Sequence, residues 1–121
     1  MECMIWLAYN FKLPLVLDYE IMTQFIEAYT PHYTPAERRN PEISPFFADL
    51  EQWRALFTVG GQDMLLDDSV MMATKWGMSG NEGTLKIYPG AAHGFTLFPP
   101  GALKVVEEAF GDIETFVTER S

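Results

Sequence analysis

Apolar residues recur along the chain with two spacings, one typical of amphipathic helices and one typical of buried strands. Residues 18–33 (DYEIMTQFIEAYTPHY) place apolar side chains three and four positions apart, which predicts a helix that ends before Pro31. Residues 54–60 (RALFTVG) form a short apolar run closed by glycine, which predicts a buried strand. Residues 83–90 (GTLKIYPG) predict a second strand in the same way.

Two longer amphipathic segments follow these predicted strands. Residues 65–80 predict a helix in which Asp67 or Asp68 supplies the N-cap and Gly80 ends the last turn. Residues 101–120 predict the last helix, because their apolar side chains recur at the spacing of one helical face. That face consists of Leu103, Val106, Ala109, Phe110, Ile113, Phe116 and Val117.

From residue 54 onward the predicted order is strand, helix, strand, helix. This alternation indicates an α/β fold in which parallel strands pack against helices. Residues 34–53 are rich in proline and polar side chains and predict a loop that contains a short helical turn. The four methionines at positions 64, 71, 72 and 78 are expected to fill the core of this fold.

The first twenty residues are apolar without matching a signal peptide or a transmembrane span. Glu2, Lys12 and Pro14 interrupt them, and no basic leader precedes the apolar part. Residues 3–9 and 13–19 are each compatible with a strand or a helix. We therefore expect no membrane span in the chain and a cytoplasmic location.

Composition and charge exclude several classes of partner. The chain has 121 residues, which is enough for one domain, and its net charge is −9. Nucleic acids and anionic membranes require a basic surface, so neither is an expected partner. The single cysteine, Cys3, excludes an internal disulfide framework and is expected to be a small buried hydrophobe rather than a nucleophile. Two distant histidines and no cysteine cluster predict no metal site.

Candidate chemistry lies in the two loops that follow the predicted strands. Asp63 comes after the first strand in GGQDML, and His93 comes after the second in PGAAHGF. Functional residues of parallel sheets gather at the carboxyl ends of strands, and neighbouring parallel strands bring such loops to one edge. A carboxylate that orients an imidazole is what a general base requires.

Each of these residues also has a purely structural interpretation. Asp63 is compatible with an ordinary turn residue, and His93 with a polar loop residue. Asp67 and Asp68 are expected to be helix caps rather than catalytic groups. His32 lies between Pro31 and Tyr33 without an evident partner, and it is expected to be structural or exposed.

From about Asp18 to its end, the chain resembles the C-terminal part of the hormone-sensitive-lipase-like family of α/β-hydrolases, which are carboxylesterases and lipases. The family pattern is a strand ending in Gly-x-x-Asp-x-Leu-x-Asp, a helix, and a strand ending in His-Gly-Phe. Here the pattern corresponds to residues 60–67 and 93–95, with Met64 where the family usually has proline. The matching stretches are RNPEISPFFADL, ALFTVGGQDMLLDDS, GNEGTLKIYPGAAHGF and GALKVVEEAFGDIETFV.

The resemblance implies that Asp63 is the acid and His93 the base of a Ser-Asp-His triad that hydrolyses small ester or acyl substrates without a metal or organic cofactor. It also implies a division of the chain. Residues 1–17 match poorly, residues 18–53 correspond to part of a cap or connecting region, and residues 54–121 are the C-terminal strand-helix-strand-helix unit.

One part of the family pattern is missing from these residues. The nucleophile of this fold precedes the acid on a G-x-S-x-G turn, with an HGGG-type oxyanion loop before it. Neither motif occurs here, and the one serine before Asp63, Ser44, lies between Ile43 and Pro45 and is expected to be a loop residue. We therefore expect this chain to be the C-terminal portion of a hydrolase, with an incomplete sheet. We expect the isolated chain to have no esterase activity.

Two other interpretations remain open. The chain is compatible with a truncated hydrolase that acts as a non-catalytic binding or interaction module. It is also compatible with a small α/β binding domain unrelated to hydrolases, which leaves both loop motifs unexplained. A cooperative, monomeric fold favours a self-sufficient module, whereas a molten or aggregated chain favours a fragment with an unpaired sheet edge.

Overall fold

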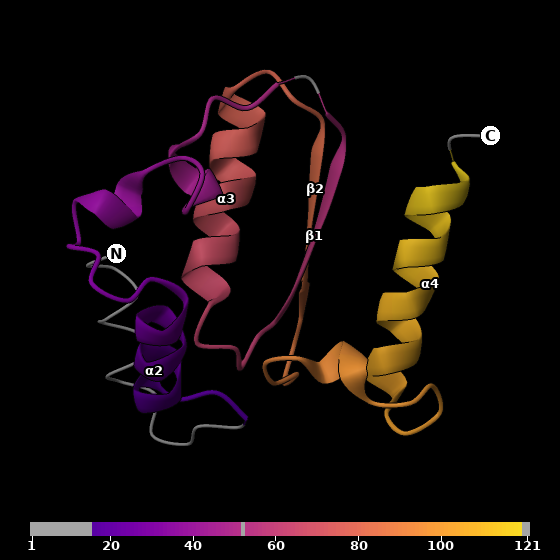
Figure 1. Ribbon diagram of the computed structural model, residues 1–121. Coiled ribbons are helices and arrows are strands. Elements are labelled where there is room, and N and C mark those ends of the chain that lie inside the picture. The colour runs from indigo at the N-terminus through magenta and orange to yellow at the C-terminus, as the bar shows by residue number, and fades with distance from the viewer. Residues whose placement is uncertain (1–15, 52, 120–121) are drawn as a thin grey trace.

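A computed structural model describes residues 16–51 and 53–119, in which helices and strands follow the predicted order (Figure 1). The strands β1 (Ala55–Gly60) and β2 (Gly83–Tyr88) are separated by helix α3 (Leu66–Met78), and helix α4 (Lys104–Thr118) ends the described chain. Helix α2 (Tyr19–Tyr29) precedes them, and its N-cap Asp18 accepts a hydrogen bond from the Ile21 N–H at 2.8 Å. Three short 3₁₀ turns occur at Glu37–Arg39, Pro45–Phe47 and Phe95–Leu97.

The two strands pair in parallel, as the alternation of strands and helices predicted. Their register runs from Ala55 opposite Gly83 to Gly60 opposite Tyr88. Helices α3 and α4 lie on opposite sides of this sheet (Figure 1). The α/β fold is therefore confirmed. The loops after β1 and β2 leave the sheet at the same end, because the carboxyl ends of the two parallel strands lie side by side.

The prediction of fully buried strands holds only at the carboxyl ends of the two strands. Val59 and Gly60 of β1 and Tyr88 of β2 are buried, whereas the rest of β1 is half-buried and Ile87 of β2 is 46% exposed. The physical reason is that the described sheet has two strands, so each strand is an edge strand. The incomplete sheet that the sequence led us to expect is consistent with this exposure.

The start of α3 differs from the prediction, and its end agrees with it. The helix begins at Leu66, so Asp67 and Asp68 lie in its first turn and neither is an N-cap. Acidic side chains in this turn still interact favourably with the helix dipole. At the other end, Gly80 has φ +79°, its N–H donates to Gly77 O, and the Asn81 N–H donates to Trp76 O, which forms a Schellman motif.

Helix α3 packs on β1 through aromatic side chains. The rings of Phe57 and Trp76 meet edge to face at 5.7 Å, and the Trp76 indole N–H donates to the carbonyl oxygens of Trp53 and Glu82. The predicted role of the methionines is correct for Met64, which is 4% exposed, and wrong for Met78, which is 85% exposed. Met78 is the last residue of α3 and lines a groove between this helix and the Pro45–Phe47 turn.

Helix α4 packs on the end of β2 and on the loop that follows it. Val106 and Ala109 have no exposed surface, whereas Phe110 and Val117 of the predicted apolar face are 41% and 62% exposed. A polar contact fixes the far end of the helix, where Arg54 pairs with Glu119 at 3.0 Å. The buried cluster consists of Tyr88, Ala91, Phe95, Val106 and Ala109.

Two backbone hydrogen bonds join the loops that leave the sheet. The Gly61 N–H donates to Tyr88 O at 2.8 Å, and the Gln62 N–H donates to Ala91 O at 2.9 Å. The loops approach so closely at Gly60 that a Cβ there would lie 2.3 Å from Ala91 O. Position 60 therefore requires glycine, because any side chain there would meet the Ala91 backbone.

The remaining predictions concern the ends of the chain. His32 is exposed, as expected, and adopts a φ of +70°. Cys3 and residues 3–9 lie outside the described residues, as do residues 13–15 of the second apolar segment, so their predicted roles stay predictions. Residues 16–18 of that segment lie in neither a helix nor a strand, and its last residue, Tyr19, begins α2. No helix in residues 16–51 or 53–119 is long and apolar enough to cross a membrane.

We predict that Gly60→Ala lowers the free energy of unfolding by about 1–3 kcal/mol, because the new methyl group must push the 91–92 backbone away. Gly111→Ala in α4 is the matched control, since a Cβ there meets nothing within 4 Å. The control should raise the free energy of unfolding by about 0.5–1 kcal/mol through helix propensity. Urea unfolding measures both changes, and equal effects of the two substitutions would contradict the close approach at Gly60.

Candidate functional site

Asp63 lies in the tight turn between β1 and α3, and its carboxylate is buried. Asp63 as a whole residue is 6% exposed. Its Oδ1 accepts a hydrogen bond from the Leu65 N–H at 2.9 Å, and its backbone N–H donates to Gly60 O at 3.1 Å. The contact to Leu65 holds one carboxylate oxygen next to the start of α3 and leaves the other, Oδ2, to face the next loop.

His93 lies in the loop after β2 and meets that second oxygen. Its Nδ1 is 2.9 Å from Asp63 Oδ2. The two side chains are 37% and 8% exposed, so the carboxylate is buried and the imidazole is partly open to solvent. The expectation that parallel pairing brings Asp63 and His93 together is confirmed.

The backbone around His93 is bent sharply so that the ring can turn toward Asp63. Gly90 and Gly94 adopt φ values of +74° and +66°, which favour glycine. Between them, Ala91 is buried against α4, and Phe95 follows as part of the same buried cluster. His93 is therefore flanked on both sides by residues anchored in the core.

This arrangement is suited to proton transfer. A neutral imidazole that donates from Nδ1 to a carboxylate carries its lone pair on Nε2, where it can accept a proton. Within residues 16–51 and 53–119, Nε2 of His93 makes no hydrogen bond.

Asp68 lies close enough to Asp63 for the two charges to interact. Burial raises the pKa of Asp68, and the charges of Asp67 and Asp63 act in the same direction. Its Oδ2 is buried and has no hydrogen-bond partner among the described residues. The sequence analysis had given this residue only a capping role.

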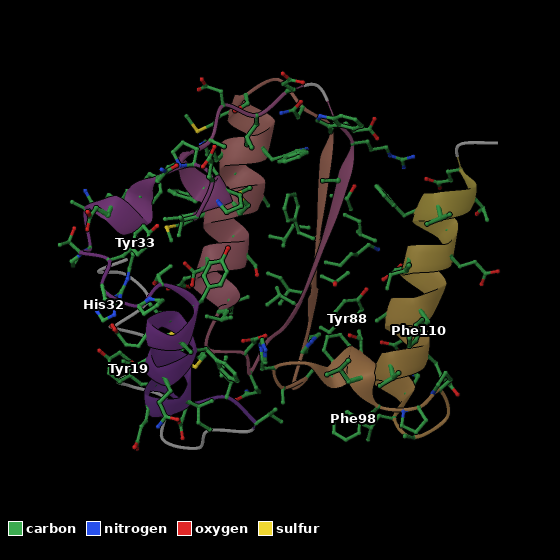
Figure 2. All side chains as sticks on the ribbon, viewed as in Figure 1. Tyr19, His32, Tyr33, Tyr88, Phe98 and Phe110 are labelled. Atoms are coloured by element: carbon green, nitrogen blue, oxygen red, sulfur yellow. The ribbon has the colours of Figure 1, made fainter. Side chains whose placement is uncertain are left out.

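The other candidate residues lie apart from the Asp63–His93 pair. Ser44 is a half-buried loop residue that precedes the 3₁₀ turn Pro45–Phe47, as expected. His32 follows α2, on the opposite side of the molecule from Tyr88 and α4 (Figure 2). In the part of the chain that the structure describes, no cluster of three or more His, Cys, Asp or Glu side chains is arranged to hold a metal ion.

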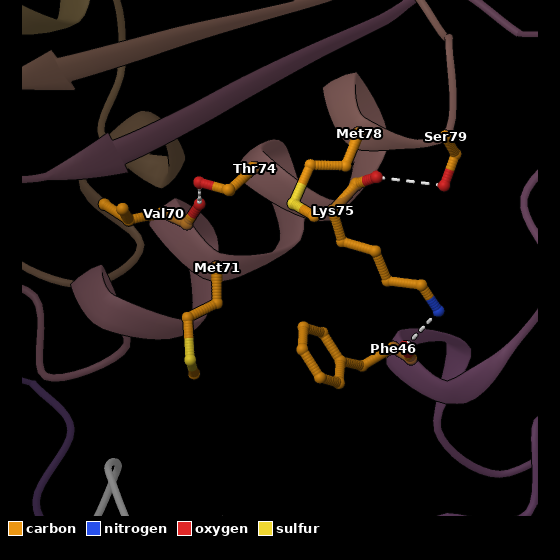
Figure 3. A pocket seen from close by; sticks show the side chains of 7 residues that line it. All are labelled: Phe46, Val70, Met71, Thr74, Lys75, Met78 and Ser79. Carbon is orange, nitrogen blue, oxygen red and sulfur yellow. Dashed lines mark hydrogen bonds between the residues drawn. The ribbon is translucent and has the colours of Figure 1, made fainter.

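Among the grooves formed by the described residues, one lies beside α3 and another beside the loop that carries His93. The first lies between α3 and the Pro45–Phe47 turn, has a volume of about 470 Å³, and is lined by Phe46, Met71 and Lys75 among others (Figure 3). Lys75 Nζ donates to the carbonyl oxygens of Phe46 and Ala48, so this lysine anchors the turn on the helix. Neither Asp63 nor His93 lines this groove.

The second groove lies beside the His93 loop. Its volume is about 530 Å³, and its lining is mainly apolar, with Val16, Ala92 and Phe95 among the residues. Ala92 directly precedes His93 in the chain. The groove therefore borders the loop that carries His93.

The sequence analysis missed Tyr88 and Asp112. The Tyr88 hydroxyl donates to Asp112 Oδ2 at 2.8 Å and connects β2 to α4. A weak signal was present, because Tyr88 follows Lys86 by two residues, which places both on one face of the strand. Nothing in the spacing of α4 singled out Asp112 as their common partner.

Comparison with known proteins agrees with this geometry. The sequence model of a family described as alpha/beta hydrolase fold matches residues 8–97, which include both Asp63 and His93. This match begins at residue 8, ten residues before Asp18, from which the sequence alone resembled the family. An AB hydrolase superfamily protein of Schizosaccharomyces pombe is 37% identical over 71 aligned positions, and the match covers 54% of this chain and 21% of that protein.

Several solved structures share the fold of the chain. A homologue of hormone-sensitive lipase from a metagenome library, EstE7, has a TM-score of 0.81 and 27% identity, covering 94% of this chain and 37% of its own. An esterase of Pyrobaculum calidifontis has a TM-score of 0.79 and 25% identity, with coverages of 94% and 37%.

The chain spans about a fifth of the curated relative and less than two fifths of these solved structures. The family match covers well over half of the chain, and the structural neighbours are esterases and hormone-sensitive-lipase-like proteins. Together with the parallel strands and the paired loops at their carboxyl ends, these matches show that the chain belongs to the α/β-hydrolase family and covers a part of its esterase- and lipase-type fold.

Proposed function

We propose that this chain supplies the acid and the base of a carboxylic ester hydrolase of the Ser-Asp-His type. The observation that carries the proposal is the 2.9 Å contact between His93 Nδ1 and the buried carboxylate of Asp63. The position of the two residues at the carboxyl ends of neighbouring parallel strands supports the same roles. Asp63 is the proposed acid, and His93 is the proposed general base.

In the proposed reaction, His93 Nε2 accepts the proton of a serine hydroxyl as that oxygen attacks the ester carbonyl. The imidazolium then donates the proton to the leaving alcohol. Asp63 keeps the imidazole in the Nδ1–H tautomer and stabilises its charged form. Water hydrolyses the acyl-enzyme by the same route, and the mechanism requires no metal ion or organic cofactor.

The serine and the oxyanion hole are proposed to lie outside these 121 residues, since neither G-x-S-x-G nor an HGGG-type loop occurs in them. The apolar groove beside Ala92 and Phe95 suits a small ester or acyl substrate. Residues 18–53 are proposed to form part of a cap or connecting region, and residues 54–121 the catalytic C-terminal unit.

A second candidate is a non-catalytic hydrolase fragment that binds a partner. The observation that favours it is again the missing nucleophile motif. The buried and hydrogen-bonded state of Asp63 argues for the catalytic origin of the pair in either case, because a residue that only forms a turn does not need a second contact to an imidazole.

We predict that the 121-residue chain hydrolyses a short p-nitrophenyl ester no faster than buffer does. The reason is that a base without a nucleophile and an oxyanion hole does not form an acyl-enzyme. His93→Ala is the matched control and should leave this background rate unchanged. Hydrolysis that disappears in the His93→Ala variant would show that the chain contains its own nucleophile.

The proposed roles of the pair are tested in a chimera in which residues 54–121 replace the corresponding C-terminal segment of the EstE7 homologue. We expect ester hydrolysis by this chimera, and we expect Asp63→Asn to lower kcat/KM by about 10⁴-fold because the imidazole is held in the wrong tautomer. His93→Ala should lower kcat/KM at least as much as Asp63→Asn does, because it removes the general base.

Glu114→Gln on α4 is the control for the chimera, since this exposed carboxylate lies outside the site. The control should hydrolyse the ester at the rate of the unsubstituted chimera. A folded chimera whose activity is insensitive to changes at both Asp63 and His93 would contradict the assignment.

A further inference from the structure

We propose that Tyr88 is a positioning residue that couples helix α4 to the geometry of the Asp63–His93 pair. This inference rests on the proposed function, because it concerns how that pair is held. Tyr88 is the last residue of β2 and is 5% exposed. Its hydroxyl, its ring and its carbonyl oxygen each contact a different part of the site.

The hydroxyl connects β2 to α4. It donates to Asp112 Oδ2 at 2.8 Å, while Asp112 Oδ1 accepts from Lys86 Nζ at 3.1 Å. Because Lys86 and Tyr88 are two residues apart on a strand, both side chains lie on the face that α4 covers. Both oxygens of one carboxylate of α4 are therefore held by β2.

The ring of Tyr88 supports the loop that carries His93. It packs at 5.2 Å against the ring of Phe95, two residues after His93. Ala91, two residues before His93, belongs to the same buried cluster, together with Val106 and Ala109 of α4. A displacement of α4 would therefore alter the packing on both sides of His93.

The carbonyl oxygen of Tyr88 holds both loops at once. It accepts the Gly61 N–H at 2.8 Å and the Ala91 N–H at 3.2 Å. Gly61 lies two residues before Asp63, so this oxygen fixes the loop of the acid relative to the loop of the base. Tyr88 thus contacts α4 through its hydroxyl and the two catalytic loops through its ring and backbone.

The protonation states of the contact keep the hydroxyl as the donor. Burial raises the pKa of Tyr88, and the carboxylates of Asp112 and Glu108 act in the same direction. The Tyr88 hydroxyl and the Lys86 ammonium lower the pKa of Asp112, so this side chain is a charged acceptor at neutral pH. The link between β2 and α4 is therefore a charge-assisted hydrogen bond.

The test measures how fast the His93 Nδ1–H proton exchanges with water, by nuclear magnetic resonance on the full 121-residue chain. His32 is an internal reference, because it is the other histidine of the chain and lies on the side of α2, away from Tyr88 (Figure 2). Tyr88→Phe removes the hydroxyl and keeps the ring. Tyr33→Phe is the matched control, since Tyr33 is an exposed tyrosine next to His32.

We expect Tyr88→Phe to speed up exchange of the His93 Nδ1–H proton by about tenfold, the order expected when one hydrogen bond that holds the site is lost. Tyr33→Phe should leave this exchange rate unchanged, and circular dichroism should show the same helix content in both variants. Asp112→Ala should speed up exchange at least as much as Tyr88→Phe, because it removes the contact to Lys86 as well as the contact to Tyr88. The double variant should exchange no faster than Asp112→Ala, because the Tyr88 hydroxyl has already lost its partner there.

Exchange rates within twofold of the unsubstituted chain in both Tyr88→Phe and Asp112→Ala would overturn the inference and leave the proposed function intact. Should Tyr88→Phe fail to fold, Asp112→Ala decides the question, because the Asp112 side chain is 32% exposed and alanine favours the helix. If the unsubstituted chain shows no Nδ1–H proton of His93 that is protected from exchange, the Asp63–His93 contact is contradicted, and with it the proposed function.

Discussion

Two backbone hydrogen bonds between the loops that follow β1 and β2 are the constraint on which the rest of the site depends. They join Gly61 to Tyr88 and Gln62 to Ala91, directly beyond the last paired residues of the sheet. Gly60 permits them, since any side chain there would meet the Ala91 carbonyl. Without this close approach, the carboxylate of Asp63 and the imidazole of His93 would have no fixed distance.

Most of this arrangement could be predicted from the sequence because it follows from local patterns. The apolar runs and their glycines fixed the strands, and the parallel pairing followed from the helix between them. Parallel pairing alone then brings Asp63 and His93 to one edge. Their identity as acid and base needed the resemblance to a family, since a lone aspartate or histidine in a loop has ordinary structural roles.

What the sequence could not predict depends on contacts between distant segments. The capping role predicted for Asp67 or Asp68 is wrong because the Asp63 side chain accepts the Leu65 N–H ahead of the helix. Met78 is exposed in a groove beside the Pro45–Phe47 turn, and methionine content alone does not show which side chains reach the core. The Tyr88–Asp112 contact joins residues 24 positions apart and has no periodic signature.

Native-state hydrogen exchange of the Gly61 and Gln62 amides tests the central claim most directly. If the two loops are joined as described, both amides exchange as slowly as the buried amide of Val59, because all three open only when the sheet edge unfolds. Exchange at the rate of an unstructured backbone, with Val59 still protected, would show that the loops separate while the sheet stays intact. The acid and the base would then have no common support, contrary to this account.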